Sequence, residues 1–142
     1  MVALFAIALL ENKDQFLMVR RIANAPFGGG MYSLVGGKVD AGELGLHAIV
    51  REVYEETGLN IAQQNFELVH TFHRRGIESE FIALCFKADI SHLPAPTNKE
   101  PDKHDDMRFF SINDLPEKML SGHKQAIQLI QKNIRYSEHG WE

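Results

Sequence analysis

Residues 36–59 read GGKVDAGELGLHAIVREVYEETGL, and they hold the strongest structural signal in the chain. Its apolar residues recur at i, i+3, i+4 and i+7, the spacing of a helix with one apolar face: Leu46, Ile49, Val50 and Val53. Gly58 stands where a helix is expected to end in a left-handed residue. The stretch therefore predicts an amphipathic helix that follows a glycine-rich segment.

Three carboxylates share this predicted helix. Glu52 precedes Glu55 and Glu56 by three and four residues, so all three project toward one region at the border of the apolar face. Without a counter-charge, each close like-charged pair costs a few tenths of a kcal/mol. A bound divalent cation would turn this repulsion into attraction toward the cation. Hard oxygen ligands such as carboxylates suit Mg²⁺ or Mn²⁺. A solvated acidic face with Arg51 pairing locally is the alternative.

The rest of the chain predicts mainly strands around this helix. Strand-like runs occupy 2–10, 15–21, 32–35, 66–75, 79–90 and 107–112, and an amphipathic helix occupies 122–134. The turn at 11–14 predicts a hairpin between the first two runs. We see no repeat or linker, and we expect one domain over residues 1–142, α/β or α+β, with a mixed sheet.

Composition excludes several classes of function. The chain has 142 residues and a formal net charge of −4, so we expect neither a nucleic-acid polymer nor an anionic membrane as partner. Cys85 is the single cysteine, which predicts a buried thiol and no intrachain disulfide. The opening MVALFAIALL lacks the basic start and cleavage pattern of a signal peptide, so we expect a buried strand and a cytoplasmic protein.

The glutamate stretch resembles the signature box of the Nudix hydrolases, the family that includes MutT-type enzymes. That box asks for Gly, five residues, Glu, seven residues, Arg-Glu, an aliphatic residue, any residue, Glu-Glu, any residue, Gly and an aliphatic residue. This chain supplies every fixed position with both gaps correct: Gly37, Glu43, Arg51, Glu52, Val53, Glu55, Glu56, Gly58 and Leu59. The resemblance implies an αβα sandwich, with a mixed sheet between the box helix and a C-terminal helix.

The resemblance also implies the roles of individual residues. Metal ligands are expected at Glu52, Glu55, Glu56 and the carbonyl of Gly36. Arg51 is expected to hold carboxylates in place, and Glu43 is either a loop ligand or the partner of Arg51. The general base is expected among Glu55, Glu52 and Asp106, a carboxylate just before the last strand, with Glu100 as a second possibility for that position.

Substrate contacts are expected around the glycine pair. Gly37 allows close backbone approach to a phosphate, and Lys38 follows it. Arg74 either neutralises a phosphate or lies in a surface turn, and Tyr32 either stacks on a base or packs in the core. The seven histidines show no spacing typical of metal ligands, and His47 faces away from the glutamates.

Three positions depart from the common family pattern outside the fixed box. Val35 stands where proline often precedes the glycine pair, Asp40 where glutamate is usual, and Tyr32 where tryptophan is common. These differences concern loop geometry and leave the expected activity unchanged.

The expected function is a Mg²⁺- or Mn²⁺-dependent pyrophosphohydrolase acting on a small nucleotide, a nucleoside diphosphate linked to another group. We expect a nucleoside triphosphate cleaved to monophosphate and pyrophosphate. ADP-ribose or another sugar nucleotide is the alternative substrate, and a non-catalytic nucleotide-sensing module is the alternative class. The sequence leaves open whether the protein forms a homodimer.

Overall fold

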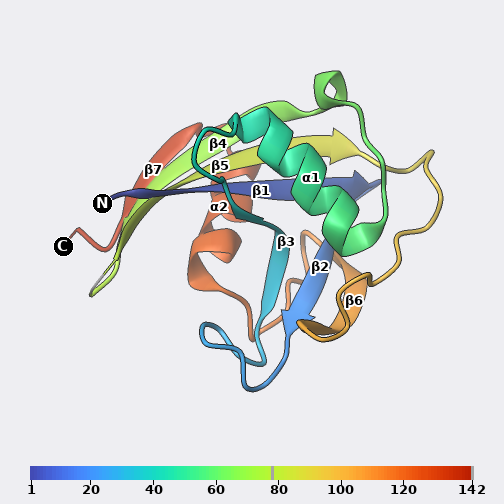
Figure 1. Cartoon of the computed structure of the whole chain (residues 1–142), viewed down its shortest axis with the longest axis horizontal. Coiled ribbons are helices and arrows are strands. Elements are labelled where there is room, and N and C mark those ends of the chain that lie inside the picture. The colour runs from blue at the N-terminus through green and yellow to red at the C-terminus, as the bar shows by residue number, and fades with distance from the viewer. Residues whose placement is uncertain (78, 142) are drawn as a thin grey trace.

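One mixed sheet lies between two helices that cover its opposite faces (Figure 1). The computed structural model describes residues 1–77 and 79–141. Its elements follow in chain order: β1 (Ala3–Asn12), β2 (Gln15–Arg21), β3 (Tyr32–Lys38), α1 (Gly45–Thr57), a short 3-10 turn (Gln63–Asn65), β4 (Glu67–Arg75), β5 (Glu80–Asp89), β6 (His104–Ser111), α2 (Ser121–Gln131) and β7 (Tyr136–His139). The predicted fold class, an α+β sandwich with a mixed sheet, is confirmed.

The sheet has the strand order β6-β2-β3-β1-β5-β4-β7. The pairs β1–β5 and β4–β7 are parallel, and the other pairs are antiparallel. The predicted hairpin pairs β1 with β2 only next to the turn, at Glu11↔Phe16 and Asn12↔Gln15. Beyond that point β3 lies between the two strands and brings the glycine pair to the centre of the sheet, beside β1.

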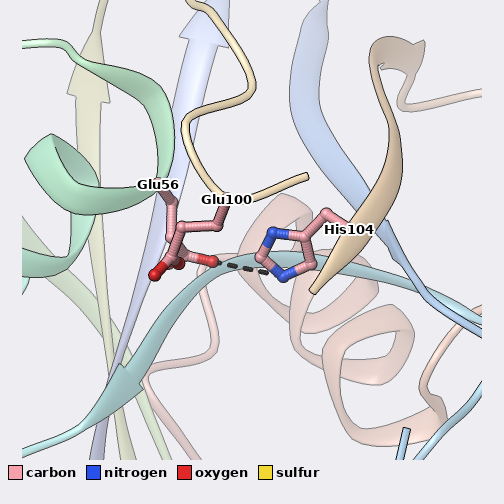
Figure 2. A group of neighbouring side chains, drawn as sticks. All are labelled: Glu56, Glu100 and His104. Carbon is pink, nitrogen blue, oxygen red and sulfur yellow. Dashed lines mark ion pairs between the residues drawn. The ribbon is translucent and has the colours of Figure 1, made fainter. Parts of the chain in front are cut away.

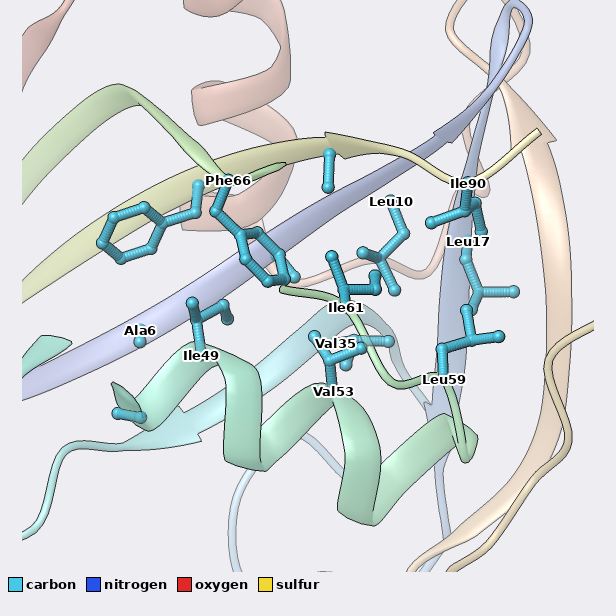
Figure 3. Packing of buried hydrophobic residues seen from close by; sticks show 14 of the residues in the cluster. Ala6, Leu10, Leu17, Val35, Ile49, Val53, Leu59, Ile61, Phe66 and Ile90 are labelled. Atoms are coloured by element: carbon cyan, nitrogen blue, oxygen red, sulfur yellow. The ribbon is translucent and has the colours of Figure 1, made fainter. Parts of the chain in front are cut away.

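Helix α1 is anchored by the apolar arc that its sequence predicts (Figure 3). Ile49 and Val53 are fully buried against Val35 and other side chains of the sheet. The helix ends at Gly58, whose φ of 75° is left-handed and whose N–H donates to Tyr54 O. This burial fixes the rotation of α1, so the position of its carboxylates at the border of the core is fixed too.

Helix α2 covers the other face of the sheet. Ala126 and Ile127 are fully buried in a cluster that includes Phe72 and Cys85. Burial raises the pKa of the Cys85 thiol to about 12, which makes it a poor nucleophile. The predicted buried thiol is confirmed. Among the described residues, no helix is long and apolar enough to cross a membrane.

Several element ends differ from the sequence prediction, and one strand was missed. Strand β3 continues through Gly36 and Gly37 to Lys38, because both glycines pair with β1. Strand β6 begins at His104 instead of residue 107, and its pairing with β2 is irregular opposite Arg20 and Arg21. Strand β7 was missed: its YSEH sequence has no apolar alternation because it lies at the edge of the sheet, beside β4.

Candidate active site

Close approach of the β1 backbone requires a glycine at position 36 of strand β3. Gly36 and Gly37 lie opposite Ile7 and Ala6 in extended pairing with β1. A Cβ atom added at Gly36 would meet the backbone oxygen of Ala6, which cannot move aside, whereas at Gly37 it would meet the flexible carboxylate end of Glu52. Strand β3 is extended at both glycines, and the Glu52 carboxylate lies close to the backbone at Gly37.

Arg51 hydrogen-bonds three carboxylates around the start of the site, and Asp40 lies 3.7 Å from its Nη2. Its Nε and Nη2 donate to the two oxygens of Glu43 over 2.8 and 2.9 Å, in the fork geometry typical of strong arginine–carboxylate pairs. Its Nη1 donates to Glu52 Oε1 over 2.9 Å and to Glu55 Oε2 over 3.3 Å. Glu43 is therefore placed as the partner of Arg51, one of its two predicted roles.

The electrostatics follow from these contacts. Hydrogen bonds from Arg51 and from the Asp40 backbone lower the pKa of Glu43 to about 2, while the Glu43 hydrogen bonds raise the pKa of Arg51. Burial raises the pKa of Glu52 although Arg51 opposes the shift. Arg51 thus compensates the carboxylates on the outer side of the helix and holds the glycine-to-helix connection in place.

Glu56 lies deeper than the other glutamates and has no such compensation. Its side chain is 4% exposed, and its Oε2 accepts a 2.9 Å hydrogen bond from the Gly36 N–H. Burial, then the negative charge of Glu52, raise the pKa of Glu56 well above its usual range. In residues 1–77 and 79–141, no lysine or arginine forms an ion pair with Glu56.

Glu100 and His104 complete the surroundings of Glu56 (Figure 2). A turn before β6 brings them together, because the N–H groups of Lys103 and His104 both donate to Glu100 O. One ligand atom from each of Glu56, Glu100 and His104 lies within 4.8 Å of the others. Burial lowers the pKa of His104, which keeps its imidazole neutral.

This donor set fits a divalent cation. It combines two carboxylates with a neutral imidazole whose buried Nδ1 has no hydrogen-bond partner among the described atoms. Binding of a cation would displace the proton that burial favours on Glu56. From the sequence, Glu100 was expected only as a second possibility for the carboxylate before the last strand, and His104 was not expected at the site. The short Glu-x-x-x-His spacing in the polar loop before β6 was the available signal.

Asp106 is not brought together with the helix glutamates. Its Oδ2 accepts hydrogen bonds from Tyr32 O–H and Arg108 Nε. Tyr32 packs edge-on against Phe110, with its ring on the face of the sheet that α2 covers. Tyr32 thus packs against the α2 side of the core, and its contact with a base stays a prediction. Its partner Asp106 lies on the face opposite α1.

An apolar cleft ends at the glycine pair. Its cavity of about 300 Å³ reaches Gly36 and Gly37 and is lined mainly by aromatic and aliphatic side chains, with Arg21 and His123 as its polar members: Phe5, Ile7, Phe27, Leu34, Phe81 and Leu120. An adjoining cavity of about 260 Å³ shares four of the same lining residues and adds Arg74 and Ser121. The structure therefore places Arg74 in a cleft rather than in a surface turn. Lys38, in contrast, is exposed and contacts Arg51 through its backbone carbonyl.

Two polar side chains of the cleft were missed by sequence reasoning. Arg21 lies with its guanidinium 5.7 Å from the Phe27 ring centroid, and its buried Nε has no partner among the described atoms. His123 Nδ1 accepts the Leu34 N–H over 3.0 Å, so its hydrogen is on Nε2. Burial lowers the pKa of His123 to about 3 and keeps the ring neutral. Neither residue lies in a recognisable motif.

Comparison with known proteins agrees with this geometry. The family model described as NUDIX domain matches residues 1–130. The ADP-ribose pyrophosphatase of Methanocaldococcus jannaschii is 31% identical over 120 residues, which cover 84% of this chain and 68% of that protein. The NAD-capped RNA hydrolase NudC of Pseudomonas aeruginosa is 28% identical over 120 residues, and the match covers 78% of this chain but only 36% of that enzyme.

Solved structures share the fold. A MutT NUDIX hydrolase from Burkholderia pseudomallei superimposes with a TM-score of 0.81 at 25% identity, covering 90% of this chain and 97% of that one. A bifunctional NMN adenylyltransferase/ADP ribose pyrophosphatase from Francisella tularensis, complexed with AMP and a Mn ion, gives a TM-score of 0.75 at 23% identity. There the match covers 94% of this chain and 42% of the other, and it shows the fold alone.

The contacts of Arg51 predict how Glu43→Gln changes stability with pH. Glu43 titrates near 4.5 when unconstrained and at about 2 when folded, so its contribution is present above the unfolded pKa. That contribution is lost as the pH falls toward the folded pKa. We expect the variant to be less stable than wild type at neutral pH, with a difference that shrinks in acid, in urea unfolding measured from neutral pH to about pH 3.

The matched control is Glu67→Gln, an exposed glutamate on β4 away from Arg51. The free energy of unfolding of this variant should differ little from that of wild type at every pH. A Glu43→Gln variant with wild-type stability at neutral pH would show that the Arg51 fork does not hold this segment in place.

Proposed function

Because the chain belongs to the NUDIX family of hydrolases, which act on phosphoanhydride bonds, we propose that it hydrolyses a small nucleoside triphosphate to a monophosphate and pyrophosphate. The observation that carries this proposal is the junction of the apolar cleft with the carboxylates. The cleft ends at Gly36 and Gly37, and Glu52 and Glu56 contact those same two residues. A nucleoside in the cleft would extend its phosphates toward the glutamates.

A divalent cation, Mg²⁺ or Mn²⁺, belongs to this proposal. When bound, it would neutralise phosphate charge and lower the pKa of the attacking water. The ligands would be drawn from Glu52, Glu55, Glu56 and the Gly36 carbonyl. Glu56 is oriented toward the site by the Gly36 N–H, and Glu52 is held by Arg51. These two contacts place the carboxylates before any substrate arrives, which reduces the reorganisation needed during reaction.

The proton of the attacking water needs an acceptor near the phosphates. Glu55 and Glu52 lie on the same turn of α1, and Arg51 contacts both. Glu55 is the more exposed, with 45% of its side chain open to solvent, and it can pass a proton outward. We assign the acceptor role to Glu55 or Glu52 ahead of Asp106, whose oxygen already accepts from Tyr32 and Arg108.

Cationic groups of the cleft would bind the phosphates. Arg21 lines the cleft and lies close enough to Glu56 for their charges to interact, so its unpartnered Nε can donate to an oxygen near the glycine pair. Arg74 lines the adjoining cavity, where it supports binding of a more distant polar group. The neutral His123 Nε2–H offers a donor to the base or sugar in the apolar part.

ADP-ribose is the second candidate substrate. The relative from Methanocaldococcus jannaschii carries the name ADP-ribose pyrophosphatase. The adjoining cavity with Arg74 and Ser121 also offers polar groups to a second sugar. Both candidates share the cleavage of a phosphoanhydride bond over the same carboxylates and differ in the group that leaves.

Glu56→Gln should lower kcat at least about 100-fold, comparable to loss of one group that stabilises transition-state charge. The amide keeps the shape of the side chain but removes the buried negative charge that would bind the cation. Turnover of the wild type should also disappear on exhaustive chelation and return with Mg²⁺ or Mn²⁺. His47→Ala, on an exposed position of the same helix, is the control and should keep wild-type turnover. Full activity of Glu56→Gln would remove Glu56 from the site.

A kinetic screen decides the substrate. We expect kcat/KM to be highest for a nucleoside triphosphate when canonical and oxidised triphosphates, diphosphates and ADP-ribose are compared. If ADP-ribose exceeded every triphosphate tenfold, a transition-state preference of about 1.4 kcal/mol, the triphosphate proposal would be wrong and the reaction class would stand. Nucleotide binding without any turnover would identify a sensing module, although the chain retains all three helix glutamates.

A further inference from the structure

His104 lies in a position that hydrogen bonding leaves unexplained. The residue is 8% exposed, and its Nδ1 has no partner among the described atoms. No hydrogen bond from these atoms to Nδ1 therefore holds the ring in this position, and Nε2 is the nitrogen that lies nearest to Glu56. Three elements converge here: Glu56 comes from α1, Glu100 from the preceding loop and His104 from the start of β6 (Figure 2).

The spacing of these side chains is that of ligands around one ion. His104 Nε2 lies 3.5 Å from Glu56 Oε1, which is long for a hydrogen bond. Two donors that share a metal at about 2.0–2.2 Å with tetrahedral or octahedral angles are about 3.0–3.5 Å apart. The other oxygen of Glu56 accepts the Gly36 N–H, so Oε1 is the one left for a cation.

Glu100 can contribute from the opposite side. One of its oxygens, Oε2, contacts Lys103 Nζ over 3.2 Å, and Lys103 is mostly exposed. The turn that binds the backbone N–H groups of Lys103 and His104 to Glu100 O fixes the glutamate and the histidine relative to each other. Arg21 on β2 pairs with His104 on β6, so its positive charge lies close to this group. A bound cation would be repelled by Arg21 and therefore needs the negative charge of both glutamates.

We propose that His104 supplies an imidazole nitrogen to a divalent cation held with Glu56 and Glu100, and that this nitrogen makes the centre prefer first-row transition ions to Mg²⁺. The inference rests on the proposed function, because it concerns the cation of the same site. Mg²⁺ prefers oxygen ligands and releases its waters reluctantly. For a site with a nitrogen donor, the affinity of transition ions rises from Mn²⁺ through Co²⁺ to Ni²⁺.

The direct test is the hyperfine coupling of bound Mn²⁺ to nitrogen. In pulsed EPR of the protein loaded with one equivalent of Mn²⁺, we expect ¹⁴N modulation that changes to ¹⁵N coupling when the histidines alone carry ¹⁵N. This comparison uses the wild-type chain and needs no variant to fold. Mn²⁺ that binds tightly without histidine nitrogen coupling would overturn the proposal and leave His104 as a hydrogen-bonded neighbour of Glu56.

A variant identifies which histidine is responsible. His104→Gln should lose the nitrogen coupling and reduce the ratio of Mn²⁺ to Mg²⁺ affinity, measured by calorimetric titration, by at least about tenfold. His47→Gln, exposed on α1, should keep both. Coupling that persists in a folded His104→Gln variant would overturn the assignment.

The outcome is distinguishable from that of the proposed function. Nitrogen coupling with no hydrolysis of any nucleotide would support this centre and contradict the activity. Hydrolysis with a cation bound only through oxygen would support the activity and contradict the role of His104.

Discussion

The site depends on how one arginine divides the charge of four carboxylates. Arg51 contacts Glu43, Glu52 and Glu55, and it does not form an ion pair with Glu56 among the described contacts. Like charges this close on one helix repel each other. The guanidinium of Arg51 compensates this repulsion only for the carboxylates on the outer side of the helix. The inner carboxylate, buried beside Gly36, is left for a cation. The same arginine therefore stabilises the fold and leaves the carboxylate of Glu56 uncompensated, near the point where phosphates would lie.

The fold supplies the surroundings of that carboxylate through close packing of backbone and side chains. Strand β3 lies close to β1 at Gly36, where a side chain would meet the Ala6 backbone, and close to the Glu52 carboxylate at Gly37. The apolar face of α1 is locked by Ile49 and Val53, so the glutamates cannot rotate away from the strand. The cleft approaches the same glycines from the α2 side. Helix α1 on one face of the sheet and the cleft on the other face thus both approach Gly36 and Gly37 in the middle of the sheet.

Sequence predicted the parts of this arrangement that are local. The spacing of Leu46, Ile49 and Val53 indicates the helix and its buried face, and the box resemblance indicates which carboxylates converge. The sequence did not indicate the contacts between distant segments. Glu100 and His104 meet Glu56 through a turn and through an irregularity between β2 and β6, and neither feature has a periodic pattern. That irregularity also means that alternation along residues 104–107 does not predict which acid faces α1. Strand β7 was missed because an exposed edge strand needs no apolar alternation.

Burial disfavours the ionised form of Glu56 and thereby destabilises the cation-free protein at neutral pH, and we expect a bound cation to offset this cost. Thermal unfolding of wild type and Glu56→Gln, each with and without Mn²⁺ or Mg²⁺, tests this expectation most directly. We predict that the cation-free variant melts at the same temperature as wild type or higher. We also predict that a cation at a hundredfold excess over Kd stabilises the wild type by about 2.7 kcal/mol and the variant far less. A cation-free variant that melts well below wild type, with equal stabilisation of both proteins by the cation, would contradict the account.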